Sequence, residues 1–275
     1  MELLNFLETF SYSQTVNIFG LPISVIMKKY IIYTLVTVFF IESTVNAQQK
    51  QKNNFEDWSE KPVVVTPGMK GKAPSDAIVL FSKNNLDQWK SIKVEENPAP
   101  WKVTASKFTI APGTGDIITK RAFGDCQLHV EWKIPANEQQ ESLNWGNSGV
   151  YLMGLYEVQI YSSYNDEHPI YYNGQAGSIY KQYKPLVNAS KPAGKWQSFD
   201  IIFTAPRFNS DQTLKSPAIL TVFHNGVLIQ NNVTLKGATT HGDYSEYTSH
   251  PEKLPLLLQE HGSKVSFRNI WIREL

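Results

Sequence analysis

Three polar side chains alternate along one short segment near the middle of the chain. In residues 147–162, NSGVYLMGLYEVQIYS, the pattern predicts two strands joined at Gly154. Glu157, Gln159 and Tyr161 point to one face of the second strand, because successive side chains of a strand alternate. A carboxylate beside an amide on one strand face suits a groove that binds a polar ligand. The alternative is a solvated outer face, which antiparallel sheets often have.

A conventional retaining glycosidase is one chemistry to weigh for this strand. Such enzymes place two carboxyl groups about 5 Å apart, one as the nucleophile and one as the acid. Sandwich glucanases carry both on one strand, in a Glu-x-Asp-x-Glu pattern or a close variant. Here Glu157 is followed by Gln159 and Tyr161, so the second carboxylate is absent. The strand therefore disfavours standard double displacement.

The elements that must position these residues are short strands. No segment carries a long apolar period of 3.6 residues, and Asn225-Gly226 is a strong signal for a two-residue hairpin. We expect an all-β fold, a two-sheet sandwich or jelly roll, with a closed barrel as the alternative. Besides the pair within 147–162, the expected strands are 78–81, 86–89, 101–103, 107–110, 126–134, 198–203, 219–224, 227–233, 256–260 and 265–273.

Charge and cysteine content exclude some classes of protein. The formal net charge of the 275 residues is +1, so no nucleic acid or other polyanionic partner is implied. Cys126 is the single cysteine, which rules out an internal disulfide. It alternates with apolar residues along its strand, so we expect a small buried side chain rather than a nucleophile.

The N-terminal part of the sequence has the layout of an exported protein. A basic start at Met27, an apolar run and small residues up to Ala47 predict a signal peptide over 27–47, with a membrane anchor as the alternative. Residues 1–26 then form an extension that we attribute to a mis-assigned start codon. Residues 48–76 are polar and contain prolines, which predicts a linker or extended arm, and 77–275 forms one domain. We expect a periplasmic or secreted mature form without stable membrane insertion, cleaved near Ala47.

Several segments in order resemble a known family. They are LFSKNNLDQW, FGDCQLHVEWKI, NSGVYL, YEVQI, GSIY, KPAGKWQSFDI, HNGV and LQEHGSKVSFRNIWIREL. Together, over about residues 77–275, they resemble the 3-keto-disaccharide hydrolase domain family. The resemblance implies a concanavalin-like jelly roll of two antiparallel sheets, exported by bacteria. It also implies cleavage of glycosides whose sugar carries a ketone at C3.

The chain departs from the family pattern in three places. Ser162 stands where many members have an Asp, which puts in doubt any metal or substrate contact by that Asp here. The usual glycine in the turn near Ser106 is replaced. Residues 207–217 look like a loop insertion.

A 3-keto sugar needs a simpler catalytic set than an ordinary glycoside. Its C2 hydrogen is acidic, so one base, donors for the enolate oxygen and an acid for the leaving oxygen suffice. Glu157 and His261 are the expected catalytic residues; either can serve as base or acid, and Glu157 is the first choice for the base. The expected substrate-binding residues are Asn147, Gln159, Tyr180, Gln259, Arg268 and Trp145.

Each of these assignments has a structural alternative. His261 precedes Gly262 and could belong only to a turn, and Arg268 could be a structural ion-pair partner. Aromatic side chains could stack on a sugar ring or fill the core; these are Trp145, Tyr151 and Tyr180. For Trp145, in a loop, we favour the sugar. His129 and His224 are expected to be surface features.

No cofactor is called for, and a divalent metal stays open. His241, Asp243 and His250 lie in one polar stretch, but their spacing matches no familiar ligand motif. The expected partner is a carbohydrate, a 3-keto-glycoside supplied by a sugar 3-dehydrogenase. The functional alternative is a noncatalytic, lectin-like sugar-binding module, since this kind of sandwich serves both purposes.

Overall fold

The chain divides into two compact units, Met1–Val64 and Val65–Leu275. The computed structural model describes residues 27–28, 30–31, 33–34, 59–69, 71–93, 98–136, 145–166, 170–240, 242 and 246–275. The expected extension 1–26 and most of the expected leader, including Ala47, lie outside these residues. Among the residues that are described, no helix is both long and apolar enough to cross a membrane.

The larger sheet has eight antiparallel strands. Their order is β13-β12-β9-β6-β15-β4-β3, and β1 also pairs with β15. The strands are β1 (Ile78–Phe81), β3 (Lys102–Thr104), β4 (Lys107–Thr109), β6 (Cys126–Lys133), β9 (Gln197–Thr204), β12 (Ile219–His224), β13 (Val227–Thr234) and β15 (Ser266–Glu274).

The smaller sheet has five antiparallel strands in the order β2-β5-β14-β7-β8. They are β2 (Trp89–Ser91), β5 (Ile117–Phe123), β7 (Ser148–Leu152), β8 (Tyr156–Ile160) and β14 (Leu254–Leu258). A separate hairpin is formed by β10 (Arg207–Phe208) and β11 (Leu214–Ser216). Two short 3-10 turns follow β8, η2 (Tyr164–Asp166) and η3 (Tyr172–Gly174).

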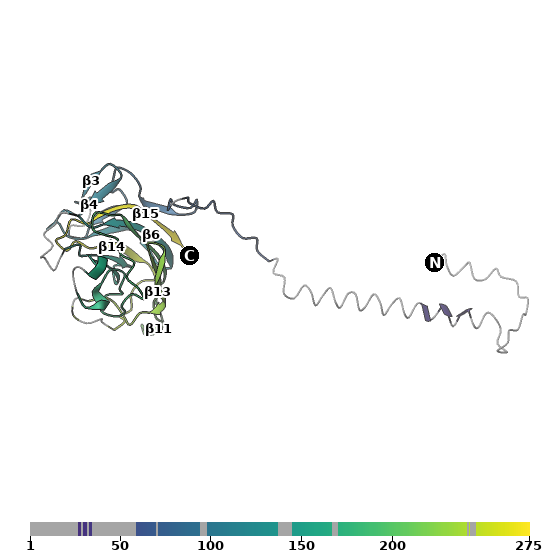
Figure 1. Cartoon of the computed structure of the whole chain (residues 1–275). Coiled ribbons are helices and arrows are strands. Elements are labelled where there is room, and N and C mark those ends of the chain that lie inside the picture. The colour runs from purple at the N-terminus through teal and green to yellow at the C-terminus, as the bar shows by residue number, and fades with distance from the viewer. Residues whose placement is uncertain are drawn as a thin grey trace, which may run out of the picture. The chain divides into compact units, whose positions relative to one another are not determined.

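The two sheets pack face to face around one hydrophobic core (Figure 1). Trp132 and Phe199 of the larger sheet and Val150 and Val158 of the smaller sheet are fully buried in the same cluster. The expected all-β two-sheet sandwich is therefore confirmed. Cys126 is also buried in this core, which raises the pKa of its thiol to about 12, so it is an inert apolar residue.

Turn chemistry explains where strands end. Asn225 and Gly226 both have positive φ, at 52° and 81°, as the predicted hairpin between β12 and β13 requires. The predicted turn at Gly154 joins β7 to β8 with a φ of 67°. The predicted strand 86–89 is wrong: Trp89 N–H donates to the Leu86 carbonyl in a turn, and β2 begins only at Trp89.

Two other segments differ from expectation. Residues 207–217 contain the β10–β11 hairpin rather than a loop alone. Strand β5 was not predicted, although its apolar start, Ile117-Ile118, pairs with β14 at the centre of the smaller sheet.

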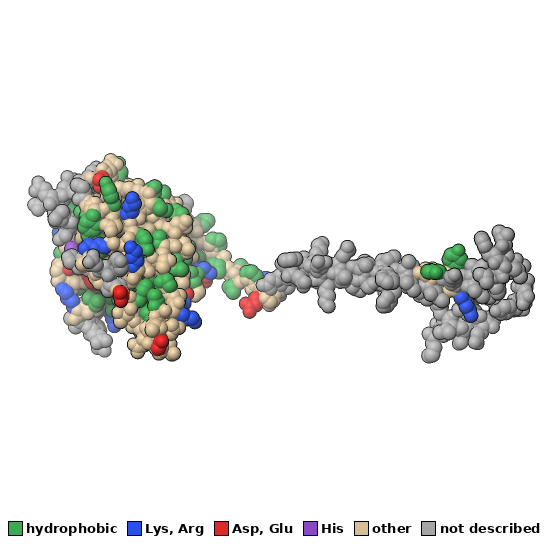
Figure 2. Space-filling model, turned by 90° about the horizontal axis from the view of Figure 1, so that it is seen from below, with side chains coloured by type: hydrophobic (Ala, Val, Ile, Leu, Met, Phe, Trp, Pro, Cys, Tyr) green, Lys and Arg blue, Asp and Glu red, His purple; other side chains and the backbone are tan. Residues whose placement is uncertain are grey.

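The last part of the expected arm packs on the domain. The Gly71 carbonyl accepts hydrogen bonds from Asn269 Nδ2 at 2.8 Å and Trp271 Nε1 at 3.0 Å, both on β15. His129 and His224 are buried rather than on the surface, at 5% and 1% exposure. On the face shown in Figure 2, basic and acidic side chains are scattered among hydrophobic ones, in keeping with the small net charge.

Candidate active site

The outer face of the smaller sheet brings together polar side chains from β7, β8 and the residue after β14. Glu157 lies opposite Tyr151 in the β7–β8 pairing, and Gln159 lies opposite Gly149. The backbone N–H of Gln259 donates to the Gly149 carbonyl at 3.0 Å. Because the intervening residues of both strands fill the core, these side chains share the face that points away from it.

Glu157 is the buried acid of this face, with 3% exposure. Burial raises its pKa to about 8, and the charge of Asp116 adds to the rise, whereas a hydrogen bond from the Tyr151 hydroxyl opposes it. The carboxyl group therefore titrates near neutral pH. This is the range in which a general acid or base works best.

Tyr151 connects Glu157 to Gln259. The Nε2 of Gln259 donates to the Tyr151 hydroxyl at 3.1 Å. Burial and the negative charge of Glu157 raise the pKa of Tyr151, so the side chain stays a neutral phenol. It can then donate its own proton to the carboxylate. These two consecutive hydrogen bonds, from Gln259 to Tyr151 and from Tyr151 to Glu157, hold the carboxyl group of Glu157 in one position.

Gly149, the glycine of the NSG triplet, makes room for that carboxyl group. A Cβ atom added at this position would lie 2.4 Å from Glu157 Oε1 and 2.7 Å from Tyr151 Cε2. Its backbone is ordinary strand, so the glycine is needed here for space rather than for a positive φ.

Asn147 and His261 lie next to each other at one end of the face. Asn147 Nδ2 is 3.4 Å from His261 Nδ1. The Ser148 hydroxyl donates to the Gln259 carbonyl at 2.8 Å, which ties the start of β7 to the chain just before His261. His261 also precedes a turn, in which Gly262 N–H donates to Glu260 Oε1 at 2.7 Å. His261 therefore lies in a turn and is also next to Asn147 of the polar face.

Asp116 is a residue of this face that sequence reasoning missed. It directly precedes the unpredicted strand β5, and its Oδ1 accepts the Glu260 N–H at 2.7 Å. The pKa of Asp116 lies above its ordinary value, because burial and the charge of Glu260 raise it more than this hydrogen bond lowers it. The two-residue apolar start of β5 was the signal that could have placed it.

Tyr180 stands beside Glu157 on the far side from β7. The backbone N–H of Gln159 donates to the Ser178 carbonyl at 3.0 Å, and Ile179 pairs with Val158. Burial, a hydrogen bond with Tyr171 and the charge of Glu157 raise the pKa of Tyr180. The structure thus brings five of the predicted substrate-binding or catalytic residues to the polar side of the smaller sheet that carries Glu157: Asn147, Gln159, Tyr180, Gln259 and His261.

Two predicted substrate-binding residues lie elsewhere. Trp145 is only 2% exposed and donates from Nε1 to the Pro135 carbonyl at 3.3 Å, so its ring faces core atoms rather than a sugar. Arg268 belongs to β15 of the larger sheet. Its Nε donates to Glu131 Oε2 at 2.5 Å, and its guanidinium lies 4.1 Å from the ring centroid of Trp196. The ion-pair alternative for Arg268 is the one that the structure supports.

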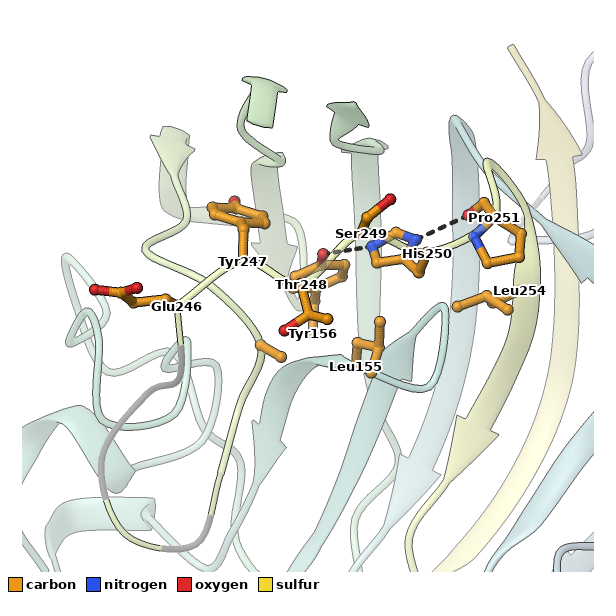
Figure 3. A pocket seen from close by; sticks show the side chains of 10 residues that line it. Leu155, Tyr156, Glu246, Tyr247, Thr248, Ser249, His250, Pro251 and Leu254 are labelled. Atoms are coloured by element: carbon orange, nitrogen blue, oxygen red, sulfur yellow. Dashed lines mark hydrogen bonds between the residues drawn. The ribbon is translucent and has the colours of Figure 1, made fainter. Parts of the chain in front are cut away.

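A pocket of about 430 Å³ lies beside the first residue of β8 (Figure 3). The Tyr156 hydroxyl donates to His250 Nε2 at 2.9 Å, because His250 Nδ1 donates to the Pro251 carbonyl at 2.8 Å. Tyr156 points to the opposite face of β8 from Glu157. This pocket is therefore separate from the cluster around Glu157.

A metal site finds no support in the described part of the chain. No group of three His, Cys, Asp or Glu side chains there could hold an ion. Two of the residues weighed from the sequence, His241 and Asp243, lie outside the described residues. The third, His250, lines the pocket of Figure 3.

Comparisons with known proteins agree with this fold and extent. A candidate glycosyl hydrolase from Parabacteroides distasonis ATCC 8503 is 45% identical in its crystal structure, with a TM-score of 0.76, over 81% of this chain and 96% of that chain. A second candidate glycosyl hydrolase from that organism shares the fold at 20% identity, with a TM-score of 0.52, over 76% and 98% of the two chains. Comparison with curated proteins gave no match. The model of the 3-keto-alpha-glucoside-1,2-lyase-like domain matches residues 76–273, and this chain therefore belongs to that family.

Proposed function

We propose that this chain is a glycoside-acting enzyme that cleaves the glycosidic bond of sugars carrying a ketone at C3. Its family and its likeness to a candidate glycosyl hydrolase support action on glycosides. The observation that carries the finer proposal is the buried carboxyl group of Glu157, with a pKa of about 8, hydrogen bonded to Tyr151 and surrounded by polar groups. A single such base suits proton abstraction next to a ketone.

The proposed reaction runs in two stages. The Glu157 carboxylate removes the proton from C2, and the electrons of the C–H bond form an enolate with the C3 ketone. The ketone re-forms as the C1–C2 double bond appears. The bond from C1 to the leaving oxygen breaks, and that oxygen takes up a proton from water. Water then adds across the double bond, with its oxygen at C1 and a proton at C2, to give the free 3-keto sugar.

Neighbouring side chains supply the hydrogen bonds that this reaction needs. Asn147 and Gln259 carry amide donors on the same sheet face as Glu157, where the enolate oxygen develops charge. His261 lies beside Asn147 and is the second titratable group on this side. We assign to these three residues the binding of the C3 oxygen.

Conventional double displacement has weaker support. Gln159 of β8 and Tyr161 directly after it occupy the positions where a second carboxyl group would stand. Asp116, whose charge acts on Glu157, comes before β5, three strands away from β8 in the smaller sheet. Asp116 accepts the Glu260 N–H, and an amide and a phenol stand at the positions that would complete a retaining pair on one strand, so double displacement has less support.

The ketone at C3 has to be made before this enzyme acts, so a sugar 3-dehydrogenase supplies the substrate. The leader expected over 27–47 makes the periplasm or the outside of the cell the proposed place of action.

The test is the pair of variants Glu157→Gln and Glu252→Gln on a 3-keto-glucoside. Removing the base is expected to lower kcat at least ~10²-fold, the usual scale for general base catalysis. Glu252 is exposed and lies outside the site, so its variant serves as the matched control and should keep wild-type turnover. Circular dichroism should show both variants folded, because Glu157→Gln removes a buried ionisable group without changing its shape.

Solvent deuterium separates the elimination route from direct hydrolysis. Water addition in D₂O should place one deuterium at C2 of the released 3-keto sugar. Wild-type turnover in Glu157→Gln would exclude it as the base, and product without deuterium at C2 would favour direct hydrolysis. A protein that binds unoxidised glycosides and leaves both forms intact would be the lectin-like alternative.

A further inference from the structure

Two tyrosines and a lysine form an aromatic wall next to Glu157 that the proposed chemistry does not yet use. The rings of Tyr171 and Tyr180 have centroids 6.1 Å apart, and their hydroxyl groups are hydrogen bonded to each other. Lys181 Nζ lies 5.9 Å from one ring centroid and 5.8 Å from the other. Tyr171 is 47% exposed, so part of the wall faces solvent.

The wall extends the smaller sheet beyond its edge strand. β7 pairs with one edge of β8, and residues 177–179 bond to the other edge, through Gly177 N–H to the Gln159 carbonyl at 2.8 Å and the Ile179–Val158 bridge. Tyr180 follows this segment directly. The wall therefore stands on the side of Glu157 opposite to Tyr151 and Gln259.

The wall is fixed before any ligand arrives. A Cβ atom at Gly174 would lie 2.5 Å from the Tyr171 ring, so this ring packs directly against the glycine backbone. Asn173 and Lys181 are joined by two hydrogen bonds, Lys181 N–H to the Asn173 carbonyl at 2.8 Å and Asn173 Nδ2 to the Lys181 carbonyl at 3.0 Å. A rigid, partly exposed aromatic surface loses little entropy on binding.

Sugar geometry indicates which part of the substrate meets the wall. C1 and C3 flank C2 in the ring, so when C2 faces Glu157 the ketone and the leaving group point to opposite sides. The donors that suit the ketone oxygen, Asn147 and Gln259, lie on the β7 and β14 side. The leaving group then points past β8 toward Tyr180 and Tyr171.

We propose that Tyr171 and Tyr180 form the leaving-group subsite, and that this subsite takes a ring with an apolar face, either a second pyranose or an arene. The proposal rests on the proposed function, because Glu157 sets the position of C2. Flat apolar ring faces stack on aromatic side chains, whereas a methyl group offers little area for such contact.

The experiment compares three 3-keto-glucosides that differ only in the leaving group: methyl, phenyl and glucosyl. Wild type is expected to prefer a ring over methyl in kcat/KM. Tyr171→Ala should reduce that preference about 5- to 10-fold, which corresponds to the loss of one stacking contact. The phenyl and glucosyl arms show whether arenes, sugars or both are accepted.

Tyr172→Ala is the matched control. Tyr172 is the next residue and is more exposed, at 66%, but the ring contacts with Tyr180 and Lys181 belong to Tyr171. The control should keep the wild-type preference. Equal kcat/KM for all three substrates in wild type, or an unchanged preference in Tyr171→Ala, would overturn the subsite.

A binding measurement keeps the subsite testable if no 3-keto substrate is cleaved. Saturation-transfer NMR with unoxidised phenyl and methyl glucosides, in both anomeric forms, reports contact without chemistry. Saturation transfer to the phenyl group that is present in wild type and Tyr172→Ala but lost in Tyr171→Ala would support the subsite. In that case only the proposed reaction would be wrong. No phenyl contact in wild type, or equal contact in all three proteins, would contradict it.

Discussion

The proton affinity of Glu157 depends on neighbours that act in opposite directions. Burial and the charge of Asp116 raise its pKa to about 8, and the hydrogen bond from Tyr151 lowers it. A base must be ionised to work, so kcat/KM is expected to rise with pH up to about 8. Tyr151→Phe removes the lowering contact and should move this rise to higher pH, whereas Asp116→Asn removes the raising charge and should move it to lower pH, each by about one pH unit.

The measurement is the pH profile of kcat/KM for the three proteins on one 3-keto-glucoside. Opposite shifts identify Glu157 as the titrating group, because a merely structural role for Tyr151 or Asp116 would lower activity at every pH. A profile that falls above pH 8 would mean that the protonated form of Glu157 is active, and it would then be the acid rather than the base.

At the scale of elements, the β7–β8 hairpin carries most of what the sequence predicts about the site. Strict alternation predicts that Glu157 and Gln159 share one face of their strand, and the structure confirms that they do, on the face that points away from the core. Alternation could not show that Trp145 lies inside, because a loop residue has no face. Alternation also could not show that Arg268 belongs to the other sheet, because the spacing of residues within one segment does not determine which distant strand that segment pairs with.

Strand β5 shows a second limit of the sequence. Its residues, IITKRAF, mix apolar and basic side chains and show no strict alternation that would predict a strand. Asp116, directly before this segment, is therefore not among the predicted site residues. The segment is a strand because of its position in the sheet: β5 lies between β2 and β14 and pairs with both. Contacts with neighbouring strands, rather than the local sequence, determine that residues 117–123 form a strand.

The hairpin also makes a prediction about Gly149. In Gly149→Ala the added methyl group would overlap Glu157 Oε1, at 2.4 Å, and must displace the carboxyl group. We expect a loss of about 10²-fold in kcat, since a displacement near 1 Å costs about that much, with circular dichroism unchanged. Gly242→Ala is the control, because no described atom lies within 4 Å of its added methyl group. Full activity in Gly149→Ala would show that the carboxyl position is not critical.

At the scale of the Val65–Leu275 unit, residues 71–76 of the expected arm are part of the folded structure. Gly71 accepts from two side chains of β15, and Asp76 forms an ion pair with Arg273. This contact explains why His129 is buried although alternation placed it on an outer face: Trp271 stacks on its ring at 5.3 Å, and Gly71 lies above it. A covering segment from far away in the sequence cannot be inferred from the pattern of one strand.

The covered His129 gives the unit a pH-dependent contribution to stability. Burial lowers the pKa of His129, but hydrogen bonds to Asp200 and Glu131 outweigh it and raise the value to about 9. A folded-state pKa above the unfolded value of about 6.5 means that charged His129 stabilises the fold fully below pH 6.5 and that this stabilisation is lost as the pH rises through 9. The shift corresponds to at most about 3 kcal/mol.

We therefore expect His129→Gln to be more destabilising at pH 6 than at pH 10, with the gap to wild type narrowing by up to about 3 kcal/mol. Urea unfolding at the two pH values measures this gap. Glu157 titrates in an overlapping range, but it is present in both proteins, so its contribution cancels in the difference. A gap that is equal at pH 6 and pH 10 would mean that His129 is held neutral between Asp200 and Trp271, and that the arm covers an uncharged ring.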